Sequence, residues 1–527
     1  MKKIVSLILV TVMLFVLWVP AFANAQNDNE YPVIYISGFG SNLFSDRMPT
    51  PETMIYPLKI DTQTIVKEKL GPILKELPGG FATGNWDVYC DRIYDTFAPI
   101  FEDIKLDNNG EASDGSGSSV DVLTKYDPVK SSGYDLWDYQ FNYDWRLSPM
   151  VVADTLKAYV EKVKAVTGEE KVSLVGRCLG GNIISAYLTK YKEHAKVNID
   201  AVMLFTPSTL GLDMFGDLFS GKVAFNPNEV DKFVGYALEQ WEMFEDPASR
   251  DLVEALISLS NELNTLDVSL DLFELAFNNI KDNILPRCIR ASFGSFPSFW
   301  AMVPADSYAE AKEYVFGGLE GEYSGMLAKM DDYYYNCQIV FCDVLKELEE
   351  AGVGIGILGK YNIPNLPVYE SAAQQGDLMS DTHNATLGAT CAPYGKVLSD
   401  EYIASIEDKR FLSPDKIIDA STCLFPEKTW FFKDLFHNYF PETVDPLIMQ
   451  FIHSNGEMTV FDDPQWPQYM HCEPKTYEIT PGVTVDDYGP EFGTFRRGIF
   501  ALKNFFITSI RFEIALIKTL ISKLINR

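Results

Sequence analysis

A cysteine lies at the centre of a short pattern that could perform acyl chemistry. Residues 172–188 are VSLVGRCLGGNIISAYL, in which Cys178 has Gly176 and Gly180 two positions to either side. An apolar run, a Gly-x-Cys-x-Gly turn and a helix-forming stretch predict a strand, a sharp bend and a helix, with the nucleophile exposed at the bend. A thiol is easier to ionise than a serine hydroxyl, and the start of a helix favours negative charge. The alternative is a buried, inert cysteine beside a tight turn.

Such a nucleophile needs a histidine further along the chain. Of the five histidines, His437 follows the strand-like TWFFKDLF and opens the Pro-bearing loop HNYFPE, so we expect it to be the base. His453, in an apolar helical pattern where it could be an ordinary packed residue, and His471, in a late irregular segment, are the alternatives. His194 comes too soon after the bend, and His383 lies in the loop expected to carry the acid.

The acid should follow the strand-like segment 353–361. Asp377 and Asp381 are the candidates in the loop YESAAQQGDLMSDTHNATLGAT, and Asp377 is the better placed. It would hold the imidazole in the useful tautomer and stabilise the imidazolium. A solvated turn aspartate is the alternative, above all for Asp381.

The oxyanion of an acyl intermediate needs two N–H donors. The amide of Leu179, directly after the nucleophile, is one candidate, and Phe39, in the loop Gly38-Phe39-Gly40 after the first strand, is the other. Arg177 could lower the pKa of the thiol or be a solvated surface group. The cysteines show no C-x-x-C spacing, so we expect neither a metal nor a cofactor.

The elements that must position these residues alternate in type. Segments 31–37, 200–207 and 353–361 are apolar and strand-like, and 151–166 has helical spacing. Strands that alternate with helices predict an α/β fold with a mostly parallel sheet. We expect the core to comprise 31–207 and 353–475, interrupted by a mainly helical cap at 208–350. An irregular excursion at about 44–130 contains DNNGEASDGSGSS (107–119), a flexible loop by composition.

The two ends of the chain differ from its body. Residues 1–25 have a basic start, an apolar run and Ala23-Asn24-Ala25, which predicts a cleaved secretory signal, with an uncleaved membrane anchor as the alternative. The net charge of −30 argues against nucleic acid as a partner. Residues 494–527 nevertheless carry seven basic residues and one acid, and Arg496, Lys503, Arg511 and Lys518 are spaced close to whole helical turns. They fit an amphipathic helix on an anionic membrane surface, with a core-docking helix as the alternative.

Several stretches together resemble one family. They are PVIYISGFGSNL, DLWDYQFNYDWRLSP, KVSLVGRCLGGNIISAYL, GSFPSFWAMVP and the segments that bear Asp377 and His437, spread over about 32–470. The chain resembles the lecithin:cholesterol acyltransferase and phospholipid acyltransferase branch of the α/β-hydrolases, and YDWRLSP is the most specific match. The resemblance implies an α/β-hydrolase fold, a membrane-facing excursion, a helical cap and transfer or hydrolysis of lipid acyl esters. The family's Gly-His-Ser-Met-Gly-Gly is Gly-Arg-Cys-Leu-Gly-Gly here.

The cysteine shifts the expected reaction towards transfer. A thioester on Cys178 reacts well with amines and thiols, and relatively less well with water than an oxygen ester does. We therefore expect an exported, extracytoplasmic and membrane-associated acyltransferase with a Cys178–His437–Asp377 triad, which takes an acyl group from a lipid or other acyl ester to an unknown acceptor. The alternatives are a lipase or phospholipase with a cysteine nucleophile, and a catalytically inactive lipid-binding protein.

Overall fold

The computed structural model describes residues 31–58, 79, 83–118, 139–224, 229, 233, 236, 270–473, 476 and 478–483. The chain divides into two units, Met1–Glu30 and Tyr31–Arg527, and every described residue belongs to the second. The expected signal (1–25) and C-terminal helix (494–527) lie outside the described residues. So do 59–78 and 119–138 of the excursion and 237–269 of the helical segment.

Eight strands form the central sheet. Their spatial order is β14-β13-β12-β7-β6-β5-β1-β4, and every pairing is parallel except that of β13 with β14. The bounds are β1 (Val33–Ile36), β4 (Tyr139–Phe141), β5 (Val172–Arg177), β6 (Ile199–Phe205), β7 (Gly354–Tyr361), β12 (Thr429–Lys433), β13 (Tyr469–Cys472) and β14 (Ile479–Pro481). Three two-stranded sheets are formed by β2 (Leu43–Phe44) with β3 (Met54–Tyr56), β8 (Ile363–Pro364) with β9 (Gln375–Gly376), and β10 (Thr390–Cys391) with β11 (Ile418–Asp419).

Helices connect the parallel strands. The α-helices are α5 (Asp87–Phe97), α7 (Pro149–Thr167), α8 (Leu179–Lys190), α9 (Lys192–Asn198), α10 (Asp213–Phe219), α13 (Leu270–Ala291), α14 (Pro297–Trp300), α15 (Tyr308–Phe316), α16 (Ser324–Asn336), α17 (Phe341–Glu350), α18 (Thr382–Ala385), α19 (Asp400–Ser405) and α20 (Asp445–His453). The 3₁₀ turns are η2 (Ala98–Phe101), η4 (Phe293–Ser295), η5 (Gln338–Val340), η6 (Glu370–Ala373), η7 (Lys409–Phe411), η8 (Ala420–Thr422), η9 (Pro426–Lys428) and η10 (Glu442–Val444).

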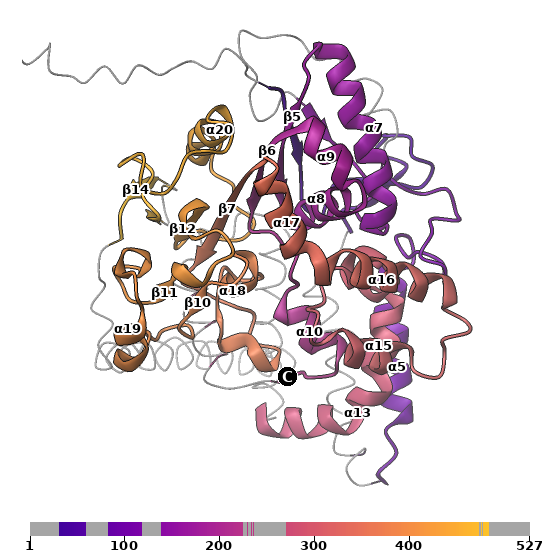
Figure 1. The fold of residues 1–527 in the computed structure, drawn as a ribbon. Helices are drawn as coiled ribbons and strands as arrows, with labels where there is room; N and C mark the ends of the chain where they lie inside the picture. Colours follow the sequence, from indigo (N-terminus) through magenta and orange to yellow (C-terminus); the bar gives the residue numbers. More distant parts are fainter. Residues whose placement is uncertain are drawn as a thin grey trace, which may run out of the picture. The chain divides into compact units, whose positions relative to one another are not determined.

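The strands alternate their side chains between two apolar layers. Ile34 and Ile36 of β1 join the cluster built with α7, α8 and α17, whereas Val33 and Tyr35 join the cluster built with α20. Strands buried on both faces are typical of parallel sheets covered by helices. In Figure 1, α8, α9 and α17 lie together over the strands of the sheet. The expected α/β class is confirmed at this level.

The order of the strands places a switch point between β1 and β5. From β1 the chain moves outward to β4, then crosses back so that β5, β6 and β7 extend the sheet in the other direction. In open α/β sheets, ligands bind outside the carboxyl ends of the strands at such a point. The loop Gly38–Gly40 follows β1, and Cys178 follows β5, so both flank this position.

Most expected elements are present near their expected bounds. Strands 31–37, 200–207 and 353–361 correspond to β1, β6 and β7, and the helix at 151–166 corresponds to α7. Between 208 and 350 the described residues form helices and no strand of the sheet. The described part of 107–119 is a loop, yet its Ser116 is fully buried and accepts a hydrogen bond from Arg146, so this loop is anchored to the core.

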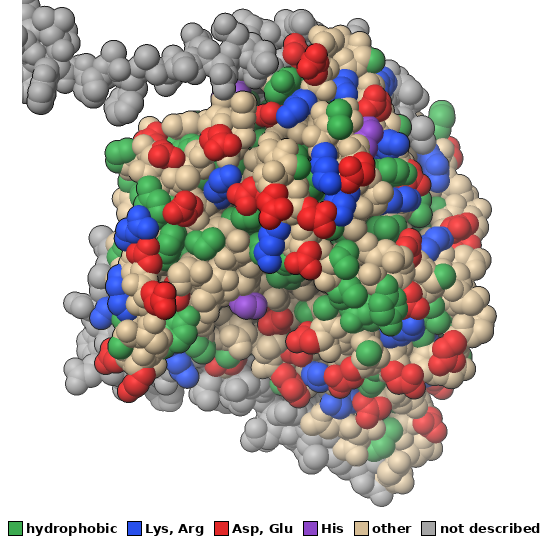
Figure 2. Space-filling view, viewed as in Figure 1, with side chains coloured by type: hydrophobic (Ala, Val, Ile, Leu, Met, Phe, Trp, Pro, Cys, Tyr) green, Lys and Arg blue, Asp and Glu red, His purple; other side chains and the backbone are tan. Residues whose placement is uncertain are grey.

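Charge is distributed over the surface. Figure 2 shows acidic and basic side chains interspersed across one face, with apolar side chains between them.

Among the described residues, no helix combines the length and the apolar character needed to cross a membrane.

Candidate active site

Cys178 occupies a strained bend between β5 and α8. Its φ of 50° and ψ of −123° place a non-glycine residue in a region that such residues rarely adopt. The backbone is held there because Cys178 N–H donates to Phe205 O (3.1 Å) and Gly181 N–H donates to Cys178 O (2.8 Å). The turn expected from the Gly-x-Cys-x-Gly pattern is therefore present.

The glycines beside the cysteine are needed for close approach. A Cβ on Gly180 would lie 2.2 Å from Ile36 O, and a Cβ on Gly176 would lie 2.5 Å from Ile184 Cδ1. In the loop that follows β1, a Cβ on Gly38 would lie 3.1 Å from Cys178 Cβ. The bend thus packs directly against the carboxyl end of β1, because all three positions lack side chains.

The structure brings His437 and Asp377 together. His437 follows β12, and Asp377 lies in the loop after β7; these strands are neighbours in the sheet. His437 Nδ1 lies 2.9 Å from Asp377 Oδ2, and His437 N–H donates to Asp377 O at 3.0 Å. The other carboxylate oxygen, Oδ1, accepts from Ser380 N–H at 2.7 Å. Both side chains are buried, so the carboxylate fixes the orientation of the ring.

Cys178 and His437 interact closely enough for each side chain to shift the pKa of the other, which links the thiol to this pair. Burial alone would raise the pKa of Cys178, but the charge and hydrogen bond of His437, followed by the charge of Arg177, lower it below its usual value. Burial alone would lower the pKa of His437, whereas Asp377 and Cys178 raise it to about 9. These opposite shifts favour a thiolate beside an imidazolium.

The two amides expected to hold an oxyanion belong to Leu179 and Phe39. The amide of Leu179 is hydrogen-bonded to the Cys178 sulfur. Phe39 directly follows Gly38, whose added Cβ would lie 3.7 Å from Cys178 Sγ. Both expected donors therefore belong to segments that border the sulfur.

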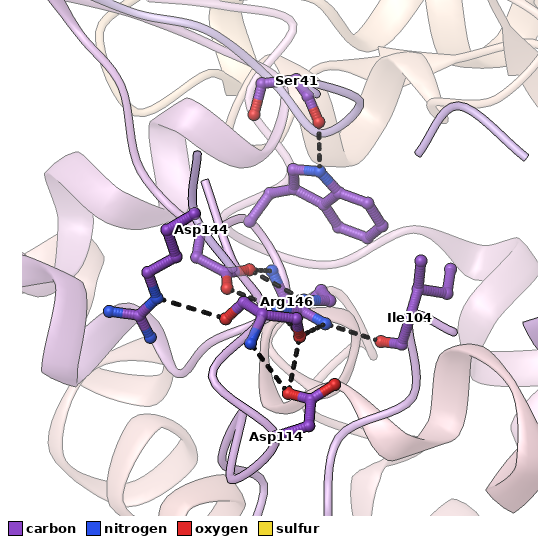
Figure 3. Close-up of polar contacts among 8 residues, drawn as sticks. Ser41, Ile104, Asp114, Asp144 and Arg146 are labelled. Carbon is purple, nitrogen blue, oxygen red and sulfur yellow. Dashed lines mark hydrogen bonds and ion pairs between the residues drawn. The ribbon is translucent and has the colours of Figure 1, made fainter. Parts of the chain in front are cut away.

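Residues of the YDWRLSP segment hold the loop that carries Phe39. Tyr143 Oη donates to Ser37 O at 2.8 Å, and Trp145 Nε1 donates to Ser41 O at 2.9 Å; Figure 3 draws the bond at Ser41 as a dashed line. The Trp145 ring also contacts that of Phe39, with centroids 5.8 Å apart. These two bonds bracket Gly38–Gly40, so the segment fixes the position of the loop.

A buried ion pair supports the same segment. The side chains of Arg146 and Asp144 form two hydrogen bonds, from Nε to Oδ1 (3.0 Å) and from Nη2 to Oδ2 (2.7 Å), and Arg146 Nη1 donates to Ile104 O at 3.0 Å (Figure 3). Arg146 is fully buried. In a pair of this kind, the mutual attraction and the hydrogen bonds offset much of the free-energy cost of removing both charges from water. The role of Tyr143, Trp145 and Arg146 was not predicted from the residue pattern, although this run is the most specific part of the resemblance.

The other candidates lie elsewhere. Asp381 is buried, but its carboxylate accepts from Asp213 N–H (2.7 Å) and from Asn365 Nδ2 (3.2 Å). His471 lies in β13, not in an irregular segment, and its Nε2 is 3.3 Å from Asp434 Oδ2. His453 ends α20 and is exposed, so the expectation of a packed residue is wrong there.

The remaining two histidines also have partners away from Cys178. His194 Nε2 lies 2.7 Å from Glu161 Oε1, and His383 Nδ1 lies 2.9 Å from Ala389 O. Of the five histidines, only His437 has both the carboxylate of Asp377 and the thiol of Cys178 as partners within the part of the chain that is described.

Two cations approach the backbone of His437. Arg177 is half-buried, and its Nη2 donates to His437 O at 3.1 Å. It is therefore not the solvated surface group that the sequence allowed as one possibility. Lys360, fully buried near the end of β7, donates to the same oxygen at 2.9 Å. The signal in the sequence that could identify Lys360 is a lone lysine within the apolar strand VGIGILGKY.

The thiol is less open than the pattern predicted. Cys178 is 4% exposed, so the expectation of a side chain exposed at the bend is wrong for this conformation. Any acyl donor must displace neighbouring groups to reach the sulfur.

All eight cysteines are free. Within the described ranges, no three His, Cys, Asp or Glu side chains gather in a way that could hold a metal ion.

Comparison with known proteins adds no assignment. The chain matches no protein-family model, no curated protein and no solved structure. The geometry around Cys178 therefore carries the functional argument.

Proposed function

We propose that this chain is an exported acyltransferase of the α/β-hydrolase fold that moves an acyl group from a lipid ester to an acceptor through a thioester on Cys178. The observation that carries the proposal is the series Cys178–His437–Asp377 at the carboxyl edge of a parallel sheet, in which His437 is hydrogen-bonded to Asp377 and interacts with the thiol of Cys178. The strained backbone of Cys178 supports it, because strain of this kind clusters at functional sites. Residues 208–350 would form the cap.

In the proposed reaction, His437 transfers the protons while one bond to the acyl carbon forms and another breaks. With the Cys178 proton already on His437, the thiolate attacks the ester carbonyl, forming a C–S bond and an oxyanion held by the amides of Leu179 and Phe39. The C–O bond then breaks, and the leaving alkoxide takes the proton from His437. An acceptor alcohol or amine gives its proton to His437 as it attacks the thioester, which releases the Cys178 sulfur.

Apolar surroundings favour a lipid acyl chain as the group transferred. The ring of Phe39 contacts those of Trp145 (5.8 Å) and Phe299 (5.6 Å), and Phe299 in turn contacts Phe293 (4.9 Å). This aromatic cluster begins at the proposed oxyanion loop and is largely buried, with Trp145 0% and Phe299 2% exposed. An acyl chain that displaced part of it would enter apolar surroundings that do not suit a polar substrate.

The acyl group on Cys178 provides the test. The purified chain is incubated with mixed phospholipid vesicles, quenched in acid and digested, and the peptide bearing Cys178 is weighed. We expect a mass increase equal to one acyl group, absent in Cys178→Ala and retained in Cys337→Ala. Cys337 is a suitable control because it is equally buried, and burial raises its pKa to about 11.

The alternatives predict other results. If free fatty acid is the sole product with and without alcohol or amine acceptors, the chain is a hydrolase. If the wild-type chain forms no adduct with any phospholipid, the enzyme proposal is wrong, and a lipid-binding protein remains.

A further inference from the structure

Lys360 is a buried lysine whose ammonium group donates three hydrogen bonds to one short turn. It is 1% exposed, and its Nζ donates to Phe436 O (2.8 Å), His437 O (2.9 Å) and Tyr439 O (2.8 Å). These three carbonyls belong to the turn that follows β12 and presents the His437 ring. The lysine therefore contacts the backbone on one side of a residue whose imidazole faces Cys178 on the other.

The geometry matches the protonated form of Lys360. An ammonium has three N–H donors, and three carbonyl oxygens accept them; a neutral amine would direct its lone pair at one of these oxygens. Burial and the charge of Arg177 lower the pKa of Lys360 to about 7, against the opposing effects of Asp377, Cys472 and Cys178. The ring of Phe205, 4.7 Å from Nζ, adds a further favourable contact for a cation.

Lys433 is a second buried lysine in the same sheet, but its ammonium has a different kind of partner. Lys433, on the adjacent strand β12, is also 1% exposed, but its Nζ lies 3.3 Å from the carboxylate of Asp415. Lys433 is thus charge-compensated by a side chain. Lys360 instead has its hydrogen bonds with backbone carbonyls of the turn that holds the candidate base.

Two further contacts restrain His437. Arg177 Nη2 donates to the same carbonyl oxygen as Lys360, and the backbone N–H of His437 donates to Asp377 O. Donors from β5 and β7 thus converge on a residue that follows β12. With its main chain held on both sides, the ring can keep contact with Asp377 and Cys178 at once.

We propose that Lys360 is a positioning residue: its ammonium holds the 436–439 turn so that the His437 imidazole stays between Asp377 and the Cys178 sulfur. This inference rests on the proposed function for its purpose, but the thiol–imidazole contact that it concerns can be measured without any substrate.

The test follows the ionisation of Cys178. Thiolate absorbance in the ultraviolet is recorded against pH for each variant and for the same variant carrying Cys178→Ser, and the difference reports Cys178 alone. Lys360→Met removes the donors at similar side-chain length, and Lys433→Met is the matched control. We expect Lys360→Met to reduce the thiolate fraction at neutral pH about tenfold, a shift of about one pKa unit, while Lys433→Met leaves it unchanged.

Two more variants separate positioning from loss of charge and of volume. Lys360→Gln keeps two N–H donors without the charge, so positioning predicts a titration between wild type and Lys360→Met. In Lys360→Ala, added propylammonium should restore the thiolate, and 1-propanol, which fills the same space with a single O–H donor, should restore it only in part. The positioning role is overturned if Lys360→Met titrates like wild type, if Gln and Met behave alike, or if propanol restores as well as the amine.

Folding and the proposed function are checked separately. Circular dichroism compares the Lys360 variants with Lys433→Met, and loss of the fold in every Lys360 variant, with or without amine, would make Lys360 a purely structural residue and overturn the proposal. Failure of wild type to form an acyl adduct would instead contradict the proposed function and leave the titration result in place.

Discussion

At the scale of single residues, the central feature is a thiol and an imidazole with opposite pKa shifts. The pKa of Cys178 is lowered and that of His437 is raised to about 9, although burial acts against both shifts. Asp377 is the carboxylate that maintains this state; burial alone would raise its pKa, but His437 and then Lys360 lower it. A reactive cysteine is expected where a thiolate is stabilised in this way, and an inert one where it is not.

The pH dependence of acyl transfer should be bell-shaped. The thiolate is lost as pH falls through the lowered pKa of Cys178, and the imidazolium that protonates the leaving group is lost as pH rises through about 9. We expect the maximal rate between these limits. In His437→Gln the alkylation of Cys178 by iodoacetamide should shift to higher pH. An unchanged alkylation profile in that variant would contradict the contact between sulfur and ring.

Asp377 and Asp381 can be distinguished by matched substitutions. Asp377→Asn would place an amide donor against His437 Nδ1 and favour the wrong tautomer, so we expect the rate of acyl transfer to fall about a hundredfold or more. Burial raises the pKa of Asp381 well above its usual value, so Asp381→Asn resembles the protonated side chain already favoured there. Its rate should stay near wild type. Equal losses in the two variants would argue against Asp377 as the partner of His437.

At the scale of elements, the junction of β5, α8 and β1 determines whether the cysteine can occupy its bend. The φ of Cys178 and the contacts of Gly176, Gly180 and Gly38 arise from one constraint, the close approach of the start of α8 to the end of β1. Tyr143 and Trp145 then hold the loop after β1 at both of its ends. The proposed oxyanion donors are thus positioned by backbone packing and not by their own side chains.

Gly180→Ala should disrupt this junction. Its Cβ would lie 2.2 Å from the backbone oxygen of Ile36, which cannot move without shifting β1, so we expect a loss of about 3 kcal/mol or more of unfolding free energy and loss of acyl transfer. Gly321→Ala is the control, because its Cβ would meet no atom within 4 Å among the described residues. Urea denaturation measures both variants. A Gly180→Ala protein as stable as Gly321→Ala would contradict the packing described for the bend.

At the scale of the whole molecule, segments far apart in sequence are joined at one edge of the sheet. Cys178, Asp377 and His437 follow three different strands, and their side chains meet because β5, β7 and β12 run parallel and end on the same side. Arg146 similarly links the excursion, through Ile104 and Ser116, to the segment that holds the loop after β1. The negative charge of the chain lies outside residues 494–527, because that C-terminal segment is itself positively charged.

The C-terminal segment can be tested for membrane binding by truncation. Residues 494–527 hold seven basic residues and one acid, so removing them should weaken binding to vesicles of anionic phospholipid, and the binding of the intact chain should fall as salt rises. Neutral vesicles serve as the control. Sedimentation with vesicles measures the bound fraction, and equal binding of the intact and truncated chains would contradict this role.

The sequence alone determined the local features of the protein. Gly-x-Cys-x-Gly after an apolar run requires a tight bend, and the positions of β1, β6, β7 and α7 follow from hydrophobic periodicity, because both signals lie within a few neighbouring residues. Only the tertiary structure decided the long-range features: that Asp377 and not Asp381 contacts His437, that Lys360 and Arg177 converge on one carbonyl, and that Cys178 is nearly buried. These depend on the order and packing of strands separated by up to 260 residues, and no local pattern encodes that order.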